Sequence, residues 1–422
     1  MTAVETYLAA HESRFVDELC EYLRFPSVSA QPRHAPDMQR CAEWLVDHAR
    51  NIGLDVELCP TGGNPIVLAR TPRRAGSRKP HFVVYGHYDV QPPEPLELWS
   101  SPPFEPRRHG DHLFARGASD NKGQHFAHLK AVEAYLATGT ELPCDLTFLI
   151  EGEEEVGCTH LGGFLRQRRK DLRCASVVIS DTGMPSPRHP ALTYALRGIA
   201  AVEITVHGPN RDLHSGIFGG SVDNPAMVLC ELLAGLRDPK GRIRVPGFYD
   251  EVVPLKPYER REFARLPFAE ARERRFLGVP ALHGEAGYTF VERRSARPTC
   301  EINGLTSGYQ GEGSKTIIPA WARAKLTFRL VPNQDPATIA RRVAEHLRKS
   351  APPTVRVQVH PGHGGAPYLI DPRSNLAKAA LRALGDAFGY EPVLLREGGS
   401  IPIVNDFKRV LGADSLLLGL AL

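Results

Sequence analysis

The sequence lacks the features that mark membrane and secreted proteins. None of its 422 residues falls in an apolar run of the roughly 18 to 20 residues that a membrane-spanning helix needs. The segment Met1–Glu12 mixes apolar and acidic residues, without the basic head and apolar stretch of a signal peptide. The eight cysteines are scattered and form no CxxC pair, so we expect reduced thiols. We therefore expect a cytoplasmic protein.

An excess of one charge sign is also missing. The chain carries 52 Lys and Arg residues against 48 Asp and Glu residues, a formal net charge of +4. This near balance gives no reason to expect nucleic acid or a membrane surface as a partner. The length predicts two or three domains, and the composition, 42% hydrophobic and 24% charged, is typical of globular proteins.

Short apolar runs alternate with helical patterns in the first part of the chain, which predicts an α/β fold with a mostly parallel central sheet. Three runs are rich in β-branched and aromatic residues, as buried parallel strands are: 82–85, 146–150 and 177–180. Polar groups follow each run directly, namely His87 with Asp89, the acidic segment 151–155, and Asp181. Because open α/β sheets bind ligands at the carboxyl ends of their strands, these groups are predicted to share one site.

The pattern changes near residue 194. Strand-like segments and helical segments then follow without the earlier alternation, at 200–206, 224–236, 257–276, 322–330 and 354–359. They predict an α+β domain of residues 196–365, inserted into an α/β domain of residues 1–195 and 366–422. A helix near 374–388 and an apolar strand at 415–422 are expected to complete the α/β domain.

The first two candidate site segments contain a histidine and two aspartates. His87 and Asp89 are two residues apart at a strand end, so both side chains point to the same side, as suits a metal-binding imidazole oriented by an acid. Asp120 lies in a glycine-bounded loop, 116–123, and is a candidate for a carboxylate that bridges two metal ions. The alternatives are a strand-end histidine with an ordinary hydrogen bond and an aspartate that caps the following helix.

Four glutamates fall within the segment 151–155, directly after a predicted buried strand. Like charges in that position repel one another unless a cation is near, so a solvated acidic loop is the weaker interpretation. One glutamate can bind metal while its neighbour takes a proton from water, which is the division that hydrolysis needs. Asp181 fits a further ligand. His214, in the segment Asp212–Gly216, is on its own typical of a surface loop.

Seven segments in order resemble the zinc metallopeptidase family of aminoacylases, desuccinylases and dipeptidases, and most closely its branch of cytosolic non-specific dipeptidases and carnosinases. They are GHYDVQP (86–92), RGASDNKG (116–123), EGEEEVG (151–157), SDTG (180–183), DLHSG (212–216), FRLVPN (328–333) and REGGSIP (396–402). The resemblance covers nearly the whole chain. Each motif alone is weak, but their ordered combination is very specific.

The resemblance implies two Zn²⁺ ions per chain, with Mn²⁺ or Co²⁺ as alternatives. His87 and Asp181 would hold one ion, Glu155 the other, and Asp120 would bridge them. Asp89 would orient the histidine. These implications also include a cis peptide bond between Asp120 and Asn121, a costly form outside proline that only a constrained site tolerates.

The same resemblance implies how substrate is bound and cleaved. Glu154 would be the general base, and His214 would reach from residues 196–365, a lid and dimerisation domain, into the site of the partner subunit of a homodimer. Thr316, Arg329 and Ser400 would contact a small peptide substrate, with the guanidinium holding its C-terminal carboxylate. The expected reaction is hydrolysis of dipeptides or other short peptides.

The sequence departs from the family pattern at one point. The family has a last zinc-binding histidine soon after the strand that corresponds to 415–422, and the given sequence ends inside that strand. With Asp120 and Glu155 alone, the second ion would have fewer than the three protein ligands usual for catalytic zinc. We therefore expect the polypeptide as given to bind the second ion weakly and to be poorly active.

Two other functions remain open. One is an N-acyl amino acid deacylase, desuccinylase or carbamoylase on the same metal centre, although GHYDVQP and the charged stretch 257–276 favour a dipeptidase. The other is a non-catalytic dimeric descendant of the fold. Glu154 beside Glu155 argues against the second alternative, because a binding protein needs no general base, and the missing histidine argues for it.

Overall fold

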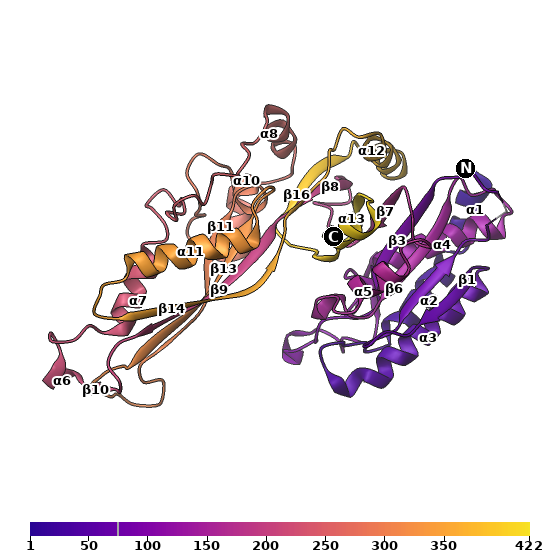
Figure 1. Cartoon of the computed structure of the whole chain (residues 1–422). Coiled ribbons are helices and arrows are strands. Elements are labelled where there is room, and N and C mark those ends of the chain that lie inside the picture. Colours follow the sequence, from indigo (N-terminus) through magenta and orange to yellow (C-terminus); the bar gives the residue numbers. More distant parts are fainter. Residues whose placement is uncertain (74–75) are drawn as a thin grey trace. The chain divides into compact units, whose positions relative to one another are not determined.

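The computed structural model describes residues 1–73 and 76–422 (Figure 1). The chain forms two compact units. Unit 1 comprises Met1–Tyr194, Ile370–Leu394 and Pro402–Leu422, and unit 2 comprises Ala195–Leu369 and Leu395–Ile401. Among the described residues, every helix is too short or too polar to cross a lipid bilayer. The predicted domain boundaries, near 195 and 366, stay predictions.

The central sheet of unit 1 has the strand order β1-β2-β6-β3-β7-β17-β8. Its strands are β1 (Asp55–Cys59), β2 (Ile66–Arg70), β3 (His81–His87), β6 (Asp145–Glu151), β7 (Ser176–Ile179), β8 (Ala191–Leu196) and β17 (Ser415–Gly419). The strand β16 (Val393–Glu397) pairs with β8, and β4 (Arg107–His109) and β5 (His112–Phe114) form a separate hairpin.

The prediction of a mostly parallel sheet is wrong, because the sheet is mixed. The pairs β6–β3, β3–β7 and β7–β17 are parallel, whereas β1–β2, β2–β6 and β17–β8 are antiparallel. Only the short segment 60–65 joins β1 to β2, too short for the crossover of a dozen or more residues that parallel neighbours need. The three predicted strands are nevertheless adjacent and parallel, so their carboxyl ends meet at one edge.

The helices of unit 1 pack against this sheet and against one another. They are α1 (Ala3–Ala10), α2 (Glu12–Leu23), α3 (Ala35–Asn51), α4 (Lys122–Ala137), α5 (Leu161–Gln167), α12 (Asn375–Phe388) and α13 (Ile403–Leu411). In α3, Met38, Leu45 and Ala49 are buried at helical spacing and pack in one cluster with Phe126 of α4 and Phe148 of β6. Burial of each large apolar side chain contributes about 1.5–3 kcal/mol relative to exposure.

Unit 2 contains a four-stranded antiparallel sheet with the order β11-β13-β9-β14. Its strands are β9 (Gly198–His207), β11 (Thr299–Ser307), β13 (Trp321–Leu330) and β14 (Arg356–Gly365). Side chains along β13 alternate between exposed and buried, and the buried ones pack with residues of α7 (Pro225–Ala234) and α11 (Pro336–Ser350) (Figure 1). A strand pattern of period two therefore gives one covered face and one open face.

Short elements complete unit 2. They are β10 (Leu213–His214), α6 (Ser215–Phe218), α8 (Pro257–Ala264), α9 (Glu270–Leu277), α10 (Phe290–Ser295), β12 (Ile317–Ile318) and β15 (Tyr368–Leu369). The charged stretch predicted to be helical at 257–276 forms two helices, and Pro267 lies in the break between them. Proline has no N–H for the helical ladder and clashes with the preceding turn, which explains the interruption.

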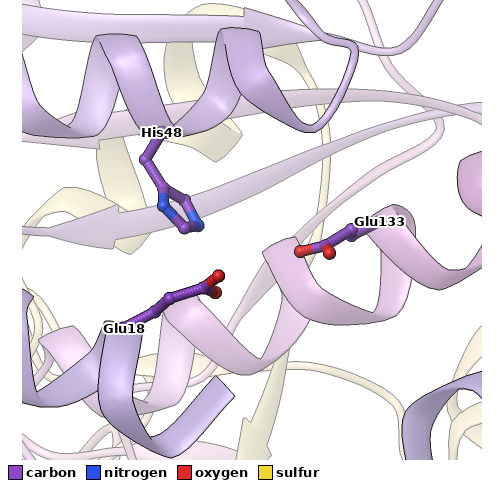
Figure 2. A group of neighbouring side chains, drawn as sticks. All are labelled: Glu18, His48 and Glu133. Atoms are coloured by element: carbon purple, nitrogen blue, oxygen red, sulfur yellow. The ribbon is translucent and has the colours of Figure 1, made fainter. Parts of the chain in front are cut away.

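A polar cluster lies among the helices α2, α3 and α4 of unit 1. Figure 2 shows Glu18 of α2, His48 of α3 and Glu133 of α4 pointing toward one another, close enough for a metal ion. The Lys130 ammonium already occupies this position: it donates hydrogen bonds to Glu18, to His48 Nε2 at 2.7 Å and to Glu133 Oε2 at 2.8 Å. Burial and that ammonium lower the pKa of His48 to about 4, so the imidazole accepts as a neutral ring. We interpret the cluster as structural.

Replacing this lysine tests the interpretation. The Lys130→Met variant keeps the apolar stem but leaves two largely buried carboxylates with Arg14 as their remaining cation. We expect the free energy of unfolding to fall by about 3–5 kcal/mol, as when one partner of a buried ion pair is removed. Urea denaturation measures it, with exposed Lys349→Met as the matched control. A loss below about 1 kcal/mol, or recovery with added zinc, would contradict a structural role.

Candidate metal centre

His87 is the last residue of β3, and its imidazole is fully buried at the edge where the parallel strands end. Its Nε2 lies 3.2 Å from Asp120 Oδ1 and 3.7 Å from Asp181 Oδ1. One ligand atom from each of the three residues lies within 4.8 Å of the others. Within the described ranges, the buried Nε2 atom has no hydrogen-bond partner. An unsatisfied imidazole nitrogen that faces two carboxylates is a suitable donor set for a divalent metal ion.

Asp89 fixes the orientation of this imidazole. The Nδ1 atom of His87 lies 3.0 Å from the backbone carbonyl of Asp89 and 3.3 Å from its Oδ1 atom. A hydrogen on Nδ1 leaves the lone pair of Nε2 directed at the two carboxylates. The buried Asp89 carboxylate also accepts hydrogen bonds from Ser29 Oγ at 2.7 Å and from the backbone N–H groups of Glu154 and Glu155. It therefore joins the histidine to the acidic segment after β6.

Asn121 is a buried connection that the sequence did not reveal. Its Oδ1 accepts from the backbone N–H of His87, and its Nδ2 donates to the carbonyl of Ser180 and, at 3.1 Å, to Asp181 Oδ1. The peptide bond between Asp120 and Asn121 is cis, as the resemblance implied. One amide side chain thus holds the histidine, the loop of Asp120 and the end of β7 in one arrangement.

The structure gives the four glutamates at the end of β6 and just after it different surroundings. Glu151 accepts a hydrogen bond from the hydroxyl of Tyr85 at 2.7 Å, and Glu153 is paired with His160 at 2.8 Å. Glu155 Oε2 accepts from the Gln91 side chain at 2.6 Å, and Glu155 lies outside the group formed by His87, Asp120 and Asp181.

The remaining glutamate, Glu154, stands apart from these three. Its carboxylate accepts no hydrogen bond from any residue in the described part of the chain. It is therefore the one free acid of the segment.

Burial of several acids close together is the main electrostatic feature of the site. Burial raises the pKa of Glu154 to about 8, and the charges of Asp181 and Glu155 add to this shift. Burial and the charge of Asp120 also raise the pKa of Glu155. Although burial disfavours the imidazolium, the nearby carboxylates raise the pKa of His87 well above its ordinary value. The three shifts describe a buried pocket in which several carboxylates lie close together, and a cation would offset their negative charge.

The predicted substrate residues lie in unit 2, where they form two separate pairs. Thr316 Oγ1 lies 3.5 Å from His214 Nε2, and both residues are exposed. The guanidinium of Arg329 donates from Nη1 to Ser400 Oγ at 3.1 Å. Strand pairing places His214 and Thr316 beyond the first residue of β13. Arg329, in contrast, lies next to the last residue of β13.

The distance between these pairs follows from the sheet. At about 3.3 Å per residue, the eight residue steps from Trp321 to Arg329 span roughly 26 Å. Figure 1 shows β10 and α10 at opposite ends of the sheet. The structure therefore brings Arg329 and Ser400 together, but it does not bring His214 near them within unit 2.

Removing the exposed acid of the metal group gives a direct test. The side chain of Asp120 is 64% exposed, so Asp120→Ala leaves the core intact. Removing a residue that only orients a metal ligand lowers metal affinity by about 10–100-fold. Because Asp120 is proposed as a ligand itself, we expect its removal to lower the affinity by at least about 100-fold. Zinc content after dialysis, measured by inductively coupled plasma mass spectrometry, checks this. Glu18→Gln, in the cluster of Figure 2, is the control and should keep full metal content. Metal loss in Glu18→Gln but not in Asp120→Ala would mean that the metal binds at Glu18, His48 and Glu133 instead.

Comparisons with known proteins agree with this geometry. Residues 83–421 match the family model described as peptidase family M20/M25/M40. The chain is 31% identical to the Cys-Gly metallodipeptidase of Candida albicans, over 96% of the chain and 87% of that protein. It is 30% identical to the human Beta-Ala-His dipeptidase, over 98% of the chain and 85% of that protein.

Solved structures give the same result. The crystal structure of human carnosine dipeptidase 1 matches with a TM-score of 0.81 and 29% identity, over 99% of this chain and 92% of that one. The structure of a dipeptidase from Saccharomyces cerevisiae matches with a TM-score of 0.81 and 28% identity, over 99% of this chain and 91% of that one. These matches confirm the resemblance that the sequence motifs indicated. The chain belongs to peptidase family M20/M25/M40 and is a metal-dependent hydrolase of that family.

Proposed function

We propose that this protein hydrolyses dipeptides at a centre that holds two divalent metal ions, zinc in the first place. The observation that carries the proposal is the buried Nε2 atom of His87, which faces Asp120 and Asp181 without a hydrogen bond. Relatives similar over almost the whole chain are described as dipeptidases with different substrates, Cys-Gly in one case and Beta-Ala-His in another. Hydrolysis of dipeptides is what those relatives have in common.

We assign the ligands as the family resemblance implies. His87 and Asp181 would hold one ion, Glu155 the other, and Asp120 would bridge them. The bridging role is supported by the short distance from Asp120 to the histidine and by the effect of the Asp120 charge on the pKa of Glu155. Bound divalent ions would polarise the scissile carbonyl and make water a stronger acid.

Glu154 would act as the general base. Of the four glutamates in the segment 151–155, Glu151, Glu153 and Glu155 accept hydrogen bonds from other side chains, which leaves Glu154 available to a water molecule. Asp89 holds the backbone of Glu154 and therefore its position relative to the metal group. The carboxylate would take the proton of the attacking water and then deliver it to the leaving amine.

Replacing this glutamate separates catalysis from metal binding. Glu154→Gln keeps the shape of the side chain but removes the proton acceptor, so we expect kcat for dipeptides to fall by about 10²–10⁴-fold with metal content unchanged. The exposed Glu97→Gln is the matched control.

The wild-type enzyme is also assayed with a panel of dipeptides and of N-acetyl and N-succinyl amino acids. Faster cleavage of those compounds than of any dipeptide would favour the deacylase alternative. Full activity of the glutamine variant would remove Glu154 from the mechanism.

In unit 2, Arg329 would bind the C-terminal carboxylate of the substrate, positioned by its hydrogen bond to Ser400. His214, beside Thr316, would donate a hydrogen bond to the developing oxyanion. A dipeptide extends only about 7 Å, whereas roughly 26 Å of β13 separates the two ends of the sheet where these groups lie. One chain therefore does not offer both groups to one substrate. This supports a homodimer, formed through unit 2, in which His214 serves the partner's site.

Mixing two inactive variants tests this arrangement. We expect His214→Ala to lower kcat by about 10²–10³-fold, through loss of an oxyanion donor, with metal content unchanged. A hybrid dimer of His214→Ala and Glu154→Gln chains has one site with both wild-type groups if the sites form across subunits.

Co-expression should therefore restore about a quarter of wild-type activity, because half of the dimers are hybrids with one working site each. Purified single variants, measured separately, are the control. No recovery in confirmed hybrids would show that each site uses its own histidine.

We propose the cytoplasm as the compartment. All eight cysteines are free thiols in the structure, as suits a reducing environment. The small and nearly balanced net charge of +4 is also consistent with a small peptide substrate rather than nucleic acid or a membrane as the partner.

A further inference from the structure

A cavity of about 430 Å³ in unit 2 is lined by an unusual number of arginines. Arg329, the proposed holder of the substrate's C-terminal carboxylate, forms part of its wall. The other arginines of the wall are Arg197, Arg237, Arg293, Arg294 and Arg297. Their only acidic neighbours in the wall are Glu285 and Glu301. The cavity therefore carries a large excess of positive charge.

Most of these guanidinium groups are not neutralised by the protein. Arg297 is paired with Glu285 through two hydrogen bonds of 2.7 and 2.8 Å, which uses that acid. Arg197, Arg294 and Arg329 have no ion-pair partner among the described residues, and the same holds for Arg237. Burial, together with the charges of Arg329 and Arg294, lowers the pKa of Arg197 to about 10, and Glu301 offsets this only in part.

The half-buried Arg197 is held rigidly in this position. Its Nε donates to the carbonyl of Gly398 at 3.1 Å and its Nη1 to the carbonyl of Arg297 at 3.4 Å. A Cβ atom at position 398 would lie 2.9 Å from Arg197 Nη2 and 2.7 Å from a backbone oxygen, so only glycine fits there. Ser400 accepts from Arg329 and donates to the carbonyl of Arg197. The two arginines thus belong to one preorganised network.

We propose that this cavity binds a second carboxylate of the substrate, so that the enzyme prefers dipeptides with a C-terminal glutamate or aspartate. The inference rests on the proposed function, in which Arg329 holds the C-terminal carboxylate. The side-chain carboxylate of such a residue is only a short alkyl chain away and enters the same cavity, toward Arg197 and Arg294. Guanidinium groups bind carboxylates in bidentate geometry, and the bound anion removes the repulsion among them.

The test compares alanyl-glutamate with alanyl-glutamine, which have nearly the same shape but differ by one charge. For the wild-type enzyme we expect kcat/KM to be at least about tenfold higher for alanyl-glutamate, as for a hydrogen bond to a charged group. The exposed Arg294 is replaced in Arg294→Gln, which should reduce this preference about tenfold. Arg275→Gln, on the exposed face of α9, removes the same charge outside the cavity and should leave the preference unchanged.

Different failures have different meanings. Equal hydrolysis of both compounds would overturn the carboxylate pocket while the dipeptidase function stands, whereas no hydrolysis of any dipeptide would overturn the function itself. An equal loss on both compounds in Arg294→Gln would mean that this arginine serves the C-terminal carboxylate, contrary to the proposal. If inorganic phosphate accelerates hydrolysis of alanyl-glutamine, and Arg294→Gln abolishes the effect, the cavity binds a free anion and the proposal is wrong.

Discussion

The arrangement of unit 1 depends on one buried nitrogen atom. His87 Nε2 faces two carboxylates and has no hydrogen bond in the described part of the chain, at a cost of about 1–3 kcal/mol for an unsatisfied buried polar group. Asp89 and Asn121 keep the atom in this state, because they satisfy the rest of the imidazole and its backbone. A bound cation would offset both the unsatisfied nitrogen and the repulsion among the acids.

Unit 2 also contains uncompensated charge, but there the charge is positive. Arginines converge on one cavity with fewer acids than they need, and a glycine at position 398 allows Arg197 to approach the backbone closely. Polar groups that serve only stability are fully paired, as Lys130 is with Glu18, His48 and Glu133. The contrast distinguishes sites from structural clusters. Charge that remains uncompensated in the protein indicates a ligand, and charge that is compensated indicates packing.

The sequence predicted the parts of the fold that depend on local patterns. The runs now seen as β3, β6 and β7 were recognisable because they are short, apolar and β-branched, and their parallel pairing places His87 and Asp181 at one edge. The mixed order of the sheet was not predictable, since an apolar run does not encode the direction of its neighbour. The role of Asn121 and the surroundings of Glu151 also depend on tertiary partners, Ser180 and Tyr85 respectively, that are distant in sequence.

The length of β13 connects the proposed substrate-binding groups to the proposed homodimer. β13 carries Arg329 near its end, and the chain reaches His214 only beyond its start, so the sheet separates the two groups by several times the length of a dipeptide. Neither side-chain motion nor a small loop shift removes such a distance, because the paired strands between them are rigid. If both groups act on one substrate, two copies of unit 2 must contribute. The proposed dimer is then a consequence of strand geometry, and the exposed position of His214 is what a residue that serves another chain requires.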